Sequence, residues 1–76
     1  MYRLYDVVRI ASGDQSQIVL DDASSIRMPV VDDIATVLLV HEFPPAYELE
    51  CLDKDGNTVW VATVPHSSVE IAKKEE

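Results

Sequence analysis

The sequence predicts a small all-β domain, and three observations carry this prediction. Short runs rich in Val, Ile, Thr, Tyr and Trp recur along the chain and are separated by Gly, Pro and Asp, which is the pattern of strands joined by turns. The stretch 44–64 has the features of a complete β-hairpin. No heptad, internal repeat or helical pattern of about ten residues interrupts these runs. We therefore expect five to six short strands and at most one helical turn.

The hairpin is the clearest single element. Apolar and polar residues alternate over 47–52, so that the glutamates share one face of the strand and the apolar side chains share the other. Residues 53–57 contain Asp, Gly and Asn, which favour a chain reversal. Residues 58–64 return as a β-branched and aromatic run that is apolar on both faces, so we expect it to need a cover on both sides.

The first half of the chain predicts one strand and a long connection. Leu4 to Ile10 alternates and is rich in valine, which favours a first strand. The connection 11–31 is long and polar, and a structureless loop of that length is unusual in a compact domain. We therefore expect short edge or arm strands at Ile18–Leu20 and Ile26–Val30, although Pro29 restricts the second to an edge or a position outside the sheet.

The second half predicts a buried strand, a corner and a short ending. After a turn at 32–33, Ile34–His41 is the most hydrophobic strand, and we expect it in the middle of the core. The two prolines in Glu42–Pro45 make a tight corner. Pro65 ends the return strand of the hairpin, His66–Val69 suits a single helical turn, and Val69–Ala72 suits a last strand.

Five short strands in so small a domain can remove most of their edges by closing into a barrel. The order of a first strand, a long connection, a three-stranded meander, a one-turn helix and a final strand is that of a partly open SH3-like β-barrel. We expect one such domain over 1–76, with a long arm or loop at 11–31 and a frayed tail at 73–76.

Three stretches of the sequence resemble a small bacterial family catalogued as the domain of unknown function numbered 4926. These stretches are Leu4–Val8, Asp33–Val37, and the hairpin from Pro45 through Asp53, Asp55 and Gly56 to Thr63. The chain departs from the family at Ala35, where the family usually has Gly, and in its longer, more polar connection 11–31. The resemblance implies an SH3-like fold and supplies no catalytic residue.

Composition and charge disfavour several classes of function. Fourteen Asp and Glu against six Lys and Arg give a net charge of −8, which repels nucleic acid and anionic lipid surfaces. The longest apolar run, 34–40, is too short to span a bilayer, and charged residues interrupt any signal peptide core near Met1. We expect a cytoplasmic protein that binds neither nucleic acid nor a membrane. Its acidity serves either solubility alone or attraction to a basic protein partner.

The residues that could support chemistry form no recognisable motif. The lone Cys51 lies at an alternating strand position and suits a small buried hydrophobe in a reducing compartment. His41 and His66 could form a metal site or an acid–base pair, but each is better explained as a residue at the rim of the barrel. Asp53 and Asp55 superficially resemble a calcium loop and fit an acidic hairpin turn. We expect no catalytic residue, metal or other cofactor.

Protein binding is the function that the sequence favours. Trp60 is the strongest single candidate for an interface residue, because tryptophan is enriched at interface hot spots. Core packing competes as an explanation of the same residue. A cover for its strand could come from the arm, either folded back or donated by another subunit. The expected interaction surface comprises Trp60, Ile18, Leu20, Ile26, Met28 and Val30.

We therefore expect a non-catalytic protein–protein interaction module that associates with itself to form a homo-oligomer, or binds another protein. The alternative is an acidic antitoxin-like or immunity-like inhibitor of a basic toxin, which the net charge of −8 and the small size of the chain suggest.

Overall fold

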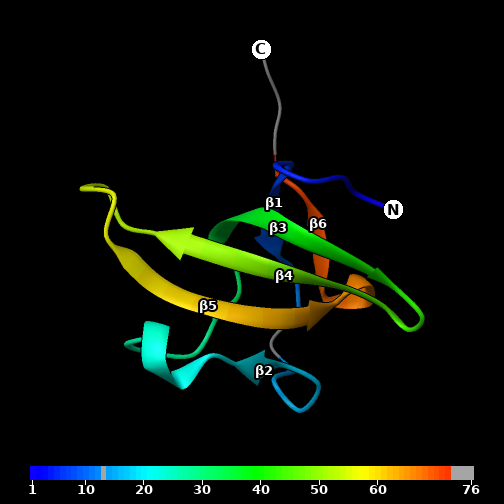
Figure 1. The fold of residues 1–76 in the computed structure, drawn as a ribbon, viewed down its shortest axis with the longest axis horizontal. Helices are drawn as coiled ribbons and strands as arrows, with labels where there is room; N and C mark the ends of the chain where they lie inside the picture. The colour runs from blue at the N-terminus through cyan, green and yellow to red at the C-terminus, as the bar shows by residue number, and fades with distance from the viewer. Residues whose placement is uncertain (13, 73–76) are drawn as a thin grey trace.

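The structure, a computed structural model, describes residues 1–12 and 14–72 and confirms the predicted all-β fold. Six antiparallel strands form one open sheet in the order β2-β5-β4-β3-β1-β6. Figure 1 shows β3, β4 and β5 side by side as the long strands, with β1 and β6 steeply inclined to them. The strands are β1 (Val7–Ile10), β2 (Val19–Leu20), β3 (Ile34–Glu42), β4 (Pro45–Leu52), β5 (Thr58–Pro65) and β6 (Val69–Ile71). The predicted tail at 73–76 lies outside the described residues.

The predicted hairpin is confirmed as β4 and β5. These strands pair from Ala46 opposite Pro65 to Leu52 opposite Thr58. At the tip, Asp53 Oδ1 accepts hydrogen bonds from the backbone N–H groups of Asp55 and Asn57, both at 2.9 Å. The Asn57 N–H group is the first of the donors that lower the pKa of Asp53. The Asp53 carboxylate thus satisfies two backbone N–H groups of the turn.

The core lies on the inward face of the long strands. Tyr47, Leu49 and Cys51 of β4 are buried while the alternate glutamates lie outward, as the alternation predicts. Trp60 of β5 is fully buried and is the largest side chain in the core. The observed role of this tryptophan is therefore core packing rather than contact with a partner.

Strands β1 and β3 differ in part from the prediction. The first strand begins at Val7 rather than Leu4, because Tyr5 has a φ of 69° that interrupts an extended backbone. β3 lies between β4 and β1 but is buried on one face only. Its outward-facing Ile34 is 47% exposed, and Leu39 is 45% exposed after an irregularity in the pairing with β4. β3 thus lies in the middle of the sheet, but only its inward face is buried, because no layer covers the outer face among the described residues.

The arm 11–31 folds back along the free edge of β5 and differs from the prediction in two ways. The expected strand at Ile18–Leu20 is present as β2 and pairs with β5. Ile26–Val30 forms no strand, because only the Ile26 N–H group bonds to Val59 and the buried Pro29 has no N–H to donate. Asp22–Ser24 forms a 3₁₀ turn, η1, so the described residues contain two helical turns rather than at most one.

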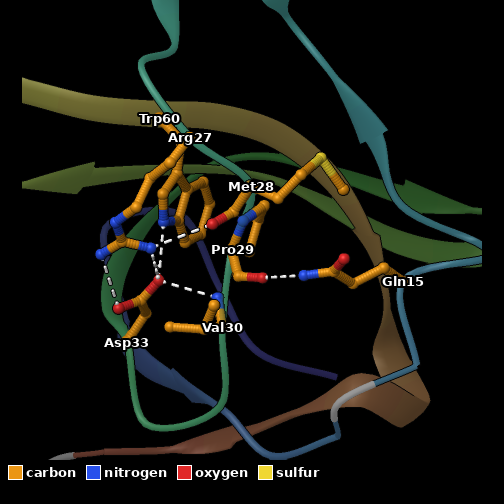
Figure 2. A network of polar contacts seen from close by, with 7 residues as sticks. All are labelled: Gln15, Arg27, Met28, Pro29, Val30, Asp33 and Trp60. Atoms are coloured by element: carbon orange, nitrogen blue, oxygen red, sulfur yellow. Dashed lines mark hydrogen bonds and ion pairs between the residues drawn. The ribbon is translucent and has the colours of Figure 1, made fainter.

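A network around Asp33 fixes the returning arm to the core (Figure 2). The Asp33 carboxylate accepts two hydrogen bonds from Arg27, at 2.7 and 3.0 Å, and one from the backbone N–H of Val30 at 2.9 Å. It also accepts the indole N–H of Trp60 at 2.9 Å. Burial by itself raises the pKa of Asp33, but the hydrogen bonds, that from Arg27 first, outweigh it, so the pKa lies below its ordinary value. One carboxylate therefore joins the arm to the largest core side chain.

The C-terminal part follows the prediction and forms one edge of the sheet. The single turn η2 (His66–Ser68) leads into β6, which pairs with β1. The hydroxyl of the buried Tyr47 accepts the backbone N–H of Tyr2 at 3.0 Å and pairs with His66 Nδ1 at 2.6 Å. The three rings lie with centroids 5.4 to 5.6 Å apart. This cluster connects the N-terminal segment to η2.

Replacing Tyr47 with Phe is expected to lower the free energy of unfolding by about 1 kcal/mol. The substitution keeps the ring but removes the hydroxyl that serves both Tyr2 and His66. Denaturant unfolding followed by circular dichroism measures the change. Tyr5→Phe is the matched control, because the Tyr5 side chain is 75% exposed and should tolerate loss of its hydroxyl. Equal stability of the two variants would contradict the role assigned to the Tyr47 hydroxyl.

Candidate functional site

The six residues of the expected interaction surface do not form one surface. Trp60 and Ile18 are buried in the core, so including them in that surface was wrong. Leu20 and Met28 are partly buried against the same core. Ile26 and Val30 are exposed, at 82% and 49%. The arm thus packs three of the six side chains, Ile18, Leu20 and Met28, against its own core.

A different site lies on the outer face of the sheet, where a shallow hollow of about 340 Å³ opens to solvent. Its floor includes Ala46 of β4 and Thr63 of β5. One rim is formed by Phe43 and Pro44, at the corner between β3 and β4, and the opposite rim includes Val19 of β2. Phe43 is 95% exposed and Val19 is 68% exposed, so both rims present apolar side chains to solvent.

A second hollow, of about 180 Å³, adjoins the first. Val19, Glu48 and Thr63 line both hollows. The second hollow continues past them to Val61 of β5 and to Asp21, which follows β2. We call the two together the outer groove. The groove therefore crosses the outward face of β4 and β5, between the arm and the corner at Phe43.

The ionisable side chains that line the outer groove are two carboxylates and one histidine. Glu48 Oε2 lies 3.2 Å from Nε2 of His41, which lines the first hollow. Asp21 lines the second hollow. Neither Lys nor Arg is among the described residues that line the groove. Arg9 pairs with Glu70 and Arg27 pairs with Asp33, away from the groove.

The strands explain why these side chains gather on one face. His41 of β3 pairs with Ala46 of β4, and Glu48 of β4 pairs with Thr63 of β5, which in turn pairs with Val19 of β2. Paired residues of neighbouring strands point to the same side of a sheet. The register that buries the inward face therefore assembles the groove on the outward one.

The residues considered for metal binding or catalysis lie apart from one another. His41 is in the outer groove, while His66 is at the end of the barrel against Tyr47. No group of three or more His, Cys, Asp or Glu side chains that could hold a metal ion occurs within 1–12 and 14–72. Cys51 is buried, and burial raises the pKa of its thiol, with a contribution from the charge of Asp33. This thiol is protonated at neutral pH and packs as a small hydrophobe.

Sequence reasoning missed Phe43 and Val19, the two apolar rims of the outer groove. A signal was present for Phe43, because a large aromatic residue flanked by Glu42 and Pro44 at a hairpin corner has little core to enter. Val19 gave a weaker signal. Its alternation with Ile18 and Leu20 implied that one face of the arm strand lies outward, but did not indicate which other residues lie beside it.

Comparison of this chain with family models, with curated proteins and with solved structures finds no match. Within the described ranges, the structure contains no helix long and apolar enough to cross a membrane.

Proposed function

We propose that this chain is a non-catalytic, cytoplasmic protein–protein interaction module that binds its partner at the outer groove. The observation that carries the proposal is the exposure of two apolar rims on one groove, with Phe43 at 95% and Val19 at 68%. Exposed aromatic side chains beside a concave surface are typical anchors of protein interfaces. The open, shallow shape suits side chains of a partner better than an enclosed small molecule.

Self-association remains a prediction, but its support has changed. The arm packs Ile18 and Met28 against its own barrel, so a donated arm is not needed to cover the core. A second copy of the chain would instead have to use exposed apolar residues such as Phe43. The net charge of −8 opposes such a contact between identical chains.

An acidic inhibitor of a basic protein is the second candidate. It is supported by the same net charge and by the carboxylates of Asp21 and Glu48 in the outer groove. An inhibitor of this kind would be encoded beside a basic, toxic protein and would bind it with an affinity that falls as salt concentration rises.

Replacing Phe43 with Ser is expected to abolish partner binding without unfolding the domain. Partner proteins that bind the wild type are first identified by mass spectrometry. Their affinities for the wild type, for Phe43→Ser and for the matched control Ile26→Ser are then compared. The control also removes an exposed apolar side chain, since Ile26 is 82% exposed, but it lies outside the groove. The proposal is supported if a partner still binds the Ile26→Ser control but binds Phe43→Ser with an affinity at least about tenfold lower.

Light scattering of the same three proteins at micromolar concentration tests whether the partner is a second copy. A clean monomer in the wild type would contradict self-association. Equal binding of all partners by Phe43→Ser and wild type would overturn the assignment of the function to the outer groove.

A further inference from the structure

The two hollows of the outer groove are adjacent and share Glu48 of β4. Ala46 borders the first hollow and Glu48 borders both. The second extends to Val61, which pairs with Glu50. Residues 46, 48 and 50 are successive positions on one face of a strand, and such positions lie about 6.6 to 6.8 Å apart. The first hollow lies toward the corner at Phe43, and the second lies toward β5 and β2, with Glu48 between them.

An extended peptide has the same spacing. Its side chains i and i+2 point to one side about 6.6 to 6.8 Å apart, while side chain i+1 points to the other. If such a segment crosses the groove from Phe43 toward Asp21 with Glu48 beneath it, side chains i and i+2 enter adjacent hollows and side chain i+1 faces solvent. The groove thus matches an extended segment better than a helix, whose neighbouring side chains on one face are three or four residues apart.

The two hollows differ in chemistry. The first has apolar walls from Val19, Phe43 and Pro44 and is the larger, at about 340 Å³. The second, at about 180 Å³, is bordered by the carboxylates of Asp21 and Glu48. A Lys or Arg side chain suits the second hollow, because its aliphatic stem can lie along an apolar wall while its charged head meets a carboxylate.

We propose that the outer groove binds an extended, basic segment of a partner protein that carries an apolar side chain and a Lys or Arg two residues apart. The apolar side chain occupies the hollow beside Phe43, and the cation occupies the hollow between Asp21 and Glu48. This inference rests on the function proposed above and specifies the chemistry of the partner. The net charge of −8 assists the encounter from a distance.

Three fluorescein-labelled peptides of twelve residues test the proposal. The first repeats Leu-Ser-Lys-Ser, which sets Leu and Lys two residues apart in both chain directions. The second repeats Leu-Lys-Ser-Ser, which has the same composition but places adjacent Leu and Lys on opposite sides. The third repeats Leu-Ser-Glu-Ser, which reverses the charge. We expect the first to bind about tenfold more tightly than the second and the third not to bind, by fluorescence anisotropy at low salt.

Variants of the protein locate the binding. Glu48→Gln should weaken the first peptide about threefold, and the double variant Asp21→Asn, Glu48→Gln should weaken it about tenfold and reduce its dependence on salt. The control Asp55→Asn removes one charge from the hairpin tip, away from the groove, and should bind as wild type. Equal binding of the two basic peptides, or equal loss in the control, would show nonspecific attraction and overturn the proposal.

The outcomes also separate this inference from the proposed function. If the acidic peptide, or a repeat of Leu and Ser without charge, binds and Phe43→Ser abolishes that binding, the groove is an interaction site but its ligand is not basic. If no peptide binds and partners of the whole protein are unaffected by Phe43→Ser, both proposals fail.

Discussion

Replacing Trp60 with Ala is expected to remove a large part of the free energy of unfolding of the domain. Trp60 is fully buried, and truncating a buried aromatic residue costs about 3 to 5 kcal/mol. The stability of a domain of 76 residues is only about 4 to 11 kcal/mol. Thermal and denaturant unfolding, followed by circular dichroism, should show a midpoint lowered by tens of degrees or no cooperative transition.

Two further variants separate the packing of Trp60 from its hydrogen bond. Trp60→Phe keeps an aromatic ring but loses the indole N–H that donates to Asp33, so we expect an intermediate loss of about 1 to 3 kcal/mol. Val61→Ala, the matched control on the outward face of the same strand, should cost about 1 kcal/mol or less. If Trp60→Ala were no more destabilising than Val61→Ala, the core assigned to Trp60 would be wrong.

Replacing Asp33 with Asn is expected to destabilise the domain by about 2 kcal/mol at neutral pH and to remove part of its acid sensitivity. The substitution loses the charged partner of Arg27 but can still accept from Trp60. Because the pKa of Asp33 is lowered in the folded state, its contribution to stability is present in full above the unfolded value of about 3.9. That contribution is lost as the pH falls through the folded value.

The measurement is the free energy of unfolding by urea from pH 7 down to pH 2.5. The difference between wild type and Asp33→Asn should be constant above about pH 5 and should shrink below about pH 4. Asp32→Asn is the control, because Asp32 is exposed and Asn tolerates its φ of 76°. A difference that persists unchanged at pH 2.5 would contradict the role assigned to the Asp33 carboxylate.

The sequence predicted most of the sheet because local patterns determine it. Alternation on 47–52 set which face of β4 is buried, and the Gly-bearing turn at 53–57 set the partner strand. The start of β1 and the course of Ile26–Val30 were less predictable. They depend on a positive φ at Tyr5 and on bonds from the arm to β5, neither of which leaves a periodic pattern.

The candidate site was less predictable than the fold, because it depends on how the strands align when they pair. Val19 lies far from Phe43 and Glu48 in the sequence, and it meets them only when β2, β4 and β5 pair in one particular alignment. Trp60 was misleading for a related reason. Its strand is apolar on both faces, so composition could not show which face enters the core, and only the partnership with Asp33 identifies the inward one.

The walls of the outer groove belong to the two connections of the barrel, the arm at Val19–Asp21 and the corner at Phe43–Pro44, while its floor belongs to the central strands. The arm is closed at its base by two backbone hydrogen bonds between Ile10 and the residues Asp32 and Asp33. Lengthening such a closed loop costs free energy only slowly. Changes of length or sequence in the arm therefore reshape one wall of the outer groove while the core stays the same.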